Sequence, residues 1–269
     1  MGETGGPHDT SGNHMEGANM PSFPSEEVPM AAVLPIEATD ISTLRRFAKA
    51  TGVAMLLSFV FGVIGELVLP GRIIVTGDAA ATAANIIRDP MLVRWTFAAY
   101  LVEGFCDILL CGFWYILLRP VSRNLALLSV LLGIVSMVTF AVAQGTFFAS
   151  TLILRETHGM NAFTAEQREA LAFVYVRVAG MIAWLFVGFY GMASMVRGYL
   201  IMRSGYLPKV LGILLMVGGA GFFLRQVTYI LAPSLSSPVL LMPMALAGLP
   251  LMGWLLIKGI DARKFGATL

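Results

Sequence analysis

Two acidic residues, Glu103 and Asp107, lie inside a long apolar segment and are the side chains of this sequence best placed to bind or transfer a charge. They are four residues apart, so on a helix they share one face. An ionisable residue at the centre of a membrane helix costs about 2.5–3.5 kcal/mol on insertion scales, and such residues often mark ion, proton or substrate sites. The pair therefore predicts a site for a proton, a cation or an amine. The alternative is a packing role, in which neighbouring helices satisfy both acids.

The same face of this segment carries further polar side chains. Helical spacing adds Thr96, Tyr100 and Trp114 to it, and Asp107 lies roughly 16 Å along the axis from Thr96, at the depth of the bilayer centre. We expect this face to point into the protein. The opposite face is apolar and suits lipid: Leu101, Phe105 and Leu109.

Polar residues in other apolar segments would complete a pocket around the two acids. Arg225 interrupts the fifth segment, with Tyr229 on the same face, and is expected to be the counter-charge. Glu66 lies toward the outer end of the first segment, and Gln144 lies in the outer half of the third. The candidate binding residues are therefore Glu103, Asp107, Arg225, Tyr229, Tyr100, Glu66 and Gln144.

Other conspicuous residues have simpler explanations. Arg94 and Arg177 flank the ends of apolar segments, where a long basic side chain can reach the interface between lipid and water. Gly218, Gly219 and Gly221 would let another helix approach closely, and packing is the interpretation we favour for them.

The sequence lacks several common catalytic and metal-binding patterns. The three histidines, His8, His14 and His158, all fall outside the apolar segments, which disfavours an intramembrane haem or histidine–metal centre. There is no His-Glu-x-x-His motif, no Ser–His pair within the membrane segments and no phosphate loop. We therefore expect no cofactor and no metal, and the missing motifs count against an enzyme. The expected partners are the lipid bilayer and a small ligand, with no nucleic acid.

The composition indicates that lipid is the solvent of this chain. Hydrophobic residues make up 57% of its 269 residues and charged residues 13%, whereas a soluble domain carries about 25% charged residues. The mean hydropathy is +0.80. A membrane helix needs about 20 apolar residues. The sequence predicts an all-α polytopic membrane protein, a six-transmembrane-helix bundle within residues 41–264, with spans at about 50–69, 95–118, 125–154, 172–203, 209–231 and 238–258.

Residues typical of helix ends punctuate these segments. Asp78 is expected to cap a short Ala-rich helix, and Asp89 with Pro90 to begin the second span. Thr164 with Gln167 forms a capping box before the fourth span. The Gly205–Pro208 segment is expected to separate the fourth span from the fifth.

The distribution of basic residues predicts the orientation. Eleven of the 18 Lys and Arg residues fall on the side of the two termini and seven on the other side. Because cytoplasmic loops carry the excess of Lys and Arg, both termini are predicted to be cytoplasmic, in a cell inner (plasma) membrane. Residues 1–40 are acidic, polar and rich in Gly and Pro, and are predicted to be a disordered tail.

Several segments resemble a family of bacterial membrane proteins catalogued as domain of unknown function 4386. The likeness covers about residues 45–260, and its most specific part is the Gly-Asp-Ala-Ala-Ala-Thr-Ala-Ala-Asn-Ile stretch before Ile87. The resemblance implies a multi-helix inner-membrane protein and supplies no activity. One departure is visible: members often carry a Glu shortly before the Trp-Leu-Leu segment, where this sequence reads Ala247-Gly-Leu-Pro250. The segments that carry the likeness are Gly65–Ile87, Cys106-Asp107, Leu118–Leu127, Arg203–Gly212 and Trp254–Gly259.

Three functions fit these observations. The first is a small solute carrier, coupled to protons, or a ligand-binding membrane protein with an outward-facing polar pocket. The second is a structural or accessory membrane protein in which the buried charges only fix helix packing. The third is a membrane enzyme that uses Glu103 and Asp107 in acid–base chemistry. We favour the first.

Overall fold

The computed structural model describes residue 2 and residues 41–155 and 159–261. The predicted disordered tail, residues 1–40, and the last predicted residues of the bundle, 262–264, lie outside the described residues. Within the described part every regular element is a helix and no strand occurs, which confirms the all-α prediction.

Among the described residues, six helical segments are long and apolar enough to cross a membrane, as predicted. The first combines α1 with two short helices, and the last joins a short 3-10 helix, η5, to α8. The elements are α1 (Ile41–Gly62), η2 (Val63–Val68), α2 (Pro70–Ile73), α3 (Ala79–Arg88), α4 (Pro90–Leu118), α5 (Arg123–Ile153), η3 (Met160–Ala162), α6 (Ala165–Ser204), α7 (Lys209–Leu231), η4 (Pro233–Leu235), η5 (Pro238–Leu241) and α8 (Met242–Ile257).

The predicted helix ends are confirmed by their caps. The carboxylates of Asp78 and Asp89 accept backbone hydrogen bonds at the starts of α3 and α4. Thr164 and Gln167 form the capping box of α6. Gly205, at a φ of 72°, ends that helix. These caps make α4 and α6 begin five and seven residues earlier than the expected spans, because a helix continues past its apolar core to its cap.

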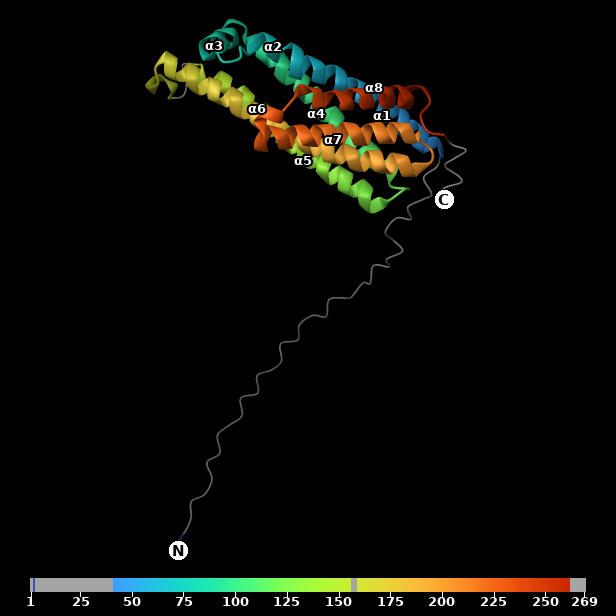
Figure 1. Cartoon of the computed structure of the whole chain (residues 1–269). Coiled ribbons are helices and arrows are strands. Elements are labelled where there is room, and N and C mark those ends of the chain that lie inside the picture. The colour runs from blue at the N-terminus through green and yellow to red at the C-terminus, as the bar shows by residue number, and fades with distance from the viewer. Residues whose placement is uncertain (1, 3–40, 156–158, 262–269) are drawn as a thin grey trace, which may run out of the picture. The chain divides into compact units, whose positions relative to one another are not determined.

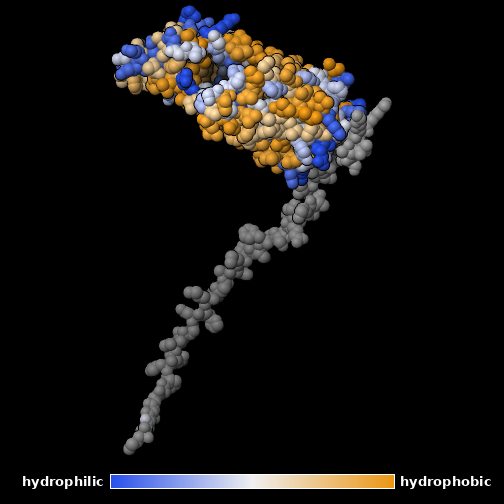
Figure 2. Space-filling model, in the orientation of Figure 1, coloured by the Kyte–Doolittle hydropathy of each residue, from blue (hydrophilic) through white to orange (hydrophobic). Residues whose placement is uncertain are grey.

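The six long helices form a closed ring. Each packs against the next along the chain, and α8 returns to pack against α1. Figure 1 shows α3 and the start of α6 at one end of the bundle, opposite the start of α1 and the end of α8. Figure 2 shows an apolar band across the middle of the bundle with hydrophilic residues at both ends. This distribution fits a bilayer around the band.

Glycines set the closest helix contacts. A Cβ atom on Gly191 would lie 2.6 Å from the carbonyl oxygen of Gly219, and one on Gly198 would lie 2.6 Å from that of Gly212. Both pairs join α6 to α7. A Cβ on Gly218 would lie 2.8 Å from the Cα atom of Met244, near the start of α8. The packing interpretation of the α7 glycines is therefore confirmed.

A π-helical turn, η2, interrupts the first span. The Leu69 amide donates a 2.9 Å hydrogen bond to the Ile64 carbonyl, five residues back. This turn places Gly65 against α4, where an added Cβ would lie 3.2 Å from a ring carbon of Tyr100. Such turns are frequent at functional sites. Here the turn carries Glu66.

Candidate functional site

A cavity of about 380 Å³ lies inside the ring, between the first span and α4 on one side and α6, α7 and α8 on the other. Its acidic wall consists of Glu66, Glu103 and Asp107. Its remaining surface is mainly apolar and includes the aromatic rings of Phe186, Tyr190 and Phe222.

The predicted orientation of α4 is confirmed. Glu103 and Asp107 are each 6% exposed, and Thr96, Tyr100 and Trp114 on the same face are also buried. The opposite face points outward: Leu101, Phe105 and Leu109 are exposed. The orientation of α4 about its axis therefore buries both acids and leaves an apolar surface facing the lipid.

Asp107 is joined to the neighbouring helix α1. The hydroxyl of Ser58 donates a hydrogen bond of 2.7 Å to Oδ1 of Asp107. Ser58 also lines the cavity. Since the hydroxyl comes from a different helix, this bond fixes both the carboxylate and the contact between α1 and α4.

Glu103 lies directly against the backbone of α1. A Cβ on Gly62 would be 2.7 Å from Oε1 of Glu103, so a larger residue at this position would displace the carboxylate. The other oxygen, Oε2, is buried and has no hydrogen-bond partner among the described residues. A buried polar atom without a partner is costly. This oxygen is therefore a buried acceptor that the described protein groups leave without a hydrogen bond.

Tyr100 and Gln144 extend the polar group from α4 to α5. Gln144 is buried, and its side chain lies beside the Tyr100 hydroxyl. The Tyr100 ring meets Phe140 edge-on, with ring centroids 5.6 Å apart. The Tyr100 hydroxyl also interacts electrostatically with the carboxyl groups of Glu66 and Glu103. Three of the seven candidate residues, Glu66, Glu103 and Asp107, thus line the cavity, and Tyr100 and Gln144 adjoin this acidic group without lining it.

The other two candidates, Arg225 and Tyr229, lie elsewhere, so the expectation that Arg225 balances the acids was wrong. Neither residue lines the cavity; Phe222 is the last α7 residue that does. Arg225 is buried with its guanidinium carbon 4.3 Å from the centre of the Trp184 ring. Its Nε and Nη1 atoms have no partner among the described residues. Helix α7 turns Arg225 toward α6, where the aromatic faces stabilise the cation.

The basic side chain that interacts electrostatically with Asp107 is Arg197 of α6, which was not among the predicted site residues. Arg197 is 4% exposed, and its Nη2 donates to the sulfur of Cys111 at 3.8 Å. Its guanidinium carbon lies 5.9 Å from the centre of the Tyr190 ring. The signal was present in the sequence, because Arg197 lies inside the expected span 172–203, about two turns before Gly205.

The cavity reaches the outer surface of the bundle between α1 and α8. These helices touch at one end, where a Cβ on Gly52 would lie 2.9 Å from the backbone nitrogen of Leu256. Farther along, the cavity separates them, and it is rimmed by Leu67 and Leu249, which are 70% and 45% exposed. No group of three or more His, Cys, Asp or Glu suited to a metal ion occurs within the part of the chain that the structure describes.

The fold and cavity define a multi-pass helical membrane protein with an acidic, partly aromatic cavity inside the bundle. The chain belongs to the family described as Domain of unknown function (DUF4386), whose model matches residues 50–259. An uncharacterized protein of Archaeoglobus fulgidus is 29% identical over 118 residues, which cover 44% of this chain and 57% of that protein. The chain thus matches little more than half the length of this curated relative. No solved structure matches the chain.

Proposed function

We propose that this protein is a small-solute carrier or ligand-binding membrane protein whose cavity takes an organic cation such as a protonated amine. The observation that carries the proposal is the buried Oε2 of Glu103, which has no hydrogen-bond partner among the residues that the structure describes and belongs to a side chain that lines an acidic cavity. An ammonium group placed there would give this oxygen a charge-assisted hydrogen bond.

The charges of the cavity support a cationic ligand. Glu66, Glu103 and Asp107 line it, and Arg197 is the cation that interacts with Asp107. One arginine cannot balance the two buried carboxylates, Glu103 and Asp107, when both are ionised, and the exposed Glu66 adds a third negative charge at the cavity. A cation bound beside Glu103 would reduce the cost of holding acids inside a membrane bundle.

The size and the apolar lining of the cavity support an organic ligand. About 380 Å³ is within the range of small-molecule sites. Phe186, Tyr190 and Phe222 offer ring faces to a cation and apolar surface to the body of an amine. The opening beside Leu67 and Leu249 would let an amphiphilic amine enter from the lipid.

The proposed location is the inner (plasma) membrane, with both termini in the cytoplasm and the cavity facing the outside. The support is the excess of Lys and Arg on the side of the termini, eleven against seven. Alkaline phosphatase fused after Leu269 should be inactive, and the same enzyme inserted after Gly159 should be active. The reverse pattern would contradict this orientation.

The proposed ligand class is tested by thermal denaturation of the purified full chain in detergent with a panel of aromatic amines and their alcohol analogues, such as phenethylamine and 2-phenylethanol. At about 100 times the dissociation constant a ligand adds about 2.7 kcal/mol of stability. Amines should raise the melting temperature and alcohols should not.

Three variants give the test its controls. Glu103→Gln should abolish the shift. Glu166→Gln, the same change at an exposed position of α6, should keep it. Arg225→Gln should also keep it, because Arg225 does not line the cavity. A panel in which no amine stabilises the protein, or in which alcohols act equally well, would favour the accessory role.

A further inference from the structure

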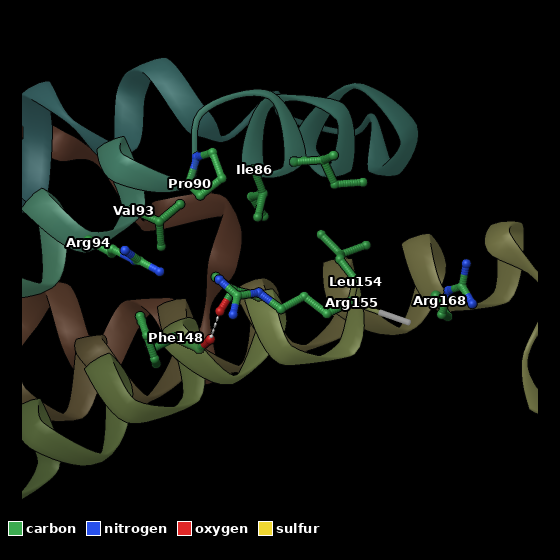
Figure 3. A pocket seen from close by; sticks show the side chains of 10 residues that line it. Ile86, Pro90, Val93, Arg94, Phe148, Leu154, Arg155 and Arg168 are labelled. Atoms are coloured by element: carbon green, nitrogen blue, oxygen red, sulfur yellow. Dashed lines mark hydrogen bonds between the residues drawn. The ribbon is translucent and has the colours of Figure 1, made fainter. Parts of the chain in front are cut away.

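A second cavity, of about 350 Å³, lies at the end of the bundle that carries α3. It is formed by α3, the first turns of α4, the end of α5 and the start of α6 (Figure 3). Three of its lining residues are arginines: Arg94, Arg155 and Arg168. None of the described residues that line it is acidic.

Two of the arginines converge. Figure 3 shows Arg94 of α4 and Arg155 at the end of α5 extending toward one another across the cavity, with Arg168 of α6 at the other end. Like charges repel at short range. An anion between two guanidinium groups would turn that repulsion into attraction and could accept bidentate hydrogen bonds from each. Asp89, five residues before Arg94, is engaged in capping α4 through the Leu92 amide at 3.0 Å. Glu169 follows Arg168 in the sequence and does not line the cavity, and Glu156, which follows Arg155, lies outside the described residues.

The rest of the cavity is mainly apolar, and its other polar side chain, Thr151, donates a hydrogen bond of 2.7 Å to the Phe148 carbonyl. Ile86 and Val93 are buried members of a core cluster at this end, and Phe148 and Leu154 complete the wall. A ligand that fits both parts has an anionic group and an apolar body. A free inorganic anion would leave the apolar wall without a contact.

The cavity lies at the depth of lipid headgroups. Arg94 is in the first turns of its span, and Arg155 follows the end of α5. Trp95 and Ile87 beside it are 62% and 58% exposed. Tryptophan is enriched at this level of a membrane protein. The neighbouring surface therefore contacts the headgroup region of the bilayer.

We propose that this cavity is a binding site for an anionic phospholipid, with the phosphate group between Arg94 and Arg155 and the start of an acyl chain along Ile86, Val93 and Phe148. This site is independent of the acidic cavity and of the function proposed for it. From the sequence, Arg94 is explained by the reach of its side chain to the interface between lipid and water. That explanation does not account for three arginines that line one mainly apolar cavity.

The test uses the full chain in detergent and native mass spectrometry with three probes: dioctanoyl phosphatidylglycerol, dioctanoyl phosphatidylcholine and inorganic phosphate. The phosphatidylglycerol should be retained at least about tenfold better than the zwitterionic lipid, as expected for about 1.4 kcal/mol from charge-assisted bonds. Equal retention of both lipids would overturn the proposal. Binding of inorganic phosphate as strong as that of phosphatidylglycerol would show a site for a free anion and would also overturn it.

Variants of the cavity arginines test whether phosphatidylglycerol is retained at this cavity. Arg94→Gln with Arg155→Gln should remove the preference for phosphatidylglycerol, and both positions are exposed enough for the chain to fold without them. Arg72→Gln removes an exposed arginine outside the cavity and should leave retention unchanged. Lysine at both cavity positions keeps the charge and should retain part of the preference. A double glutamine variant that still retains phosphatidylglycerol like the unaltered chain would refute the site.

Discussion

The hydroxyl of Ser58 in α1 donates a 2.7 Å hydrogen bond to Oδ1 of Asp107 in α4. The bond joins two helices that are separated in sequence by α2 and α3. It also gives a buried carboxylate one fixed partner at the edge of the cavity, so the orientation of Asp107 depends on the packing of α1.

Replacing Ser58 by alanine should lower the free energy of unfolding by about 0.6 kcal/mol and at most about 1.7 kcal/mol, the range of hydrogen bonds between membrane helices. The free energy of unfolding is measured by titrating the protein with dodecyl sulfate. Thr146→Ala is the comparison, since its hydroxyl bonds to the backbone of its own helix. In a double-mutant cycle with Asp107→Ala the two losses should not add. Additive losses would mean that the bond contributes nothing.

Arg197 and Asp107 should be energetically coupled. Arg197→Met removes the cation that interacts electrostatically with the buried Asp107 carboxylate, and Asp107→Asn removes that negative charge from the surroundings of the buried Arg197. Each change should destabilise the protein, and the double variant should be more stable than the sum of the two losses predicts, by about 0.5–3 kcal/mol. The same cycle between Arg225→Met and Asp107→Asn should show no coupling. Coupling to Arg225 instead of Arg197 would contradict the arrangement.

Gly62→Ala should disturb the cavity more than the fold. The added Cβ would lie 2.7 Å from Oε1 of Glu103, and the carboxylate can move because it ends a flexible side chain. Amine affinity should fall about tenfold, which corresponds to about 1.4 kcal/mol, while the free energy of unfolding changes by less than about 1 kcal/mol. Gly112→Ala on α4 has open space around its Cβ and should leave affinity unchanged. Unaltered affinity in Gly62→Ala would argue against Glu103 as the binding group.

Gly198→Ala should damage the fold itself. Its Cβ would lie 2.6 Å from the Gly212 carbonyl oxygen, a backbone atom that moves only if α6 and α7 separate. Overpacking of this kind costs about 1–3 kcal/mol or more. Gly180→Ala on the same helix meets no atom within 4 Å and should be tolerated. Melting temperatures in detergent compare the two, and equal values would show that α6 and α7 are not held at this distance.

The sequence was sufficient for features that depend on local chemistry. Apolar runs of membrane length predicted the six spans, and capping residues such as Asp89 and Thr164 predicted the caps of α4 and α6. The four-residue spacing of Glu103 and Asp107 predicted the buried face of α4. Each of these follows from one helix alone, so no knowledge of its neighbours was needed.

The neighbours themselves could not be predicted. In a membrane bundle the residues that face lipid and those that face the core are both apolar, so the pattern does not say which helices adjoin. Arg225 was paired with the acids because both interrupt apolar runs, yet its cation packs on Trp184. The contact of Gly62 with Glu103 joins α1 to α4 across 41 positions of sequence, which no local spacing reveals.

The most direct test of the proposed cation site measures how affinity changes when the charge is removed from the ligand and when it is removed from Glu103. Dissociation constants of an amine and its alcohol analogue are measured by calorimetry for the unaltered chain and for Glu103→Gln. A charge-assisted hydrogen bond contributes about 1.5–3 kcal/mol, so the unaltered chain should prefer the amine by at least about tenfold. Glu103→Gln should bind both ligands alike, with Glu166→Gln behaving as the unaltered chain. A preference for the amine that survives in Glu103→Gln would contradict the account.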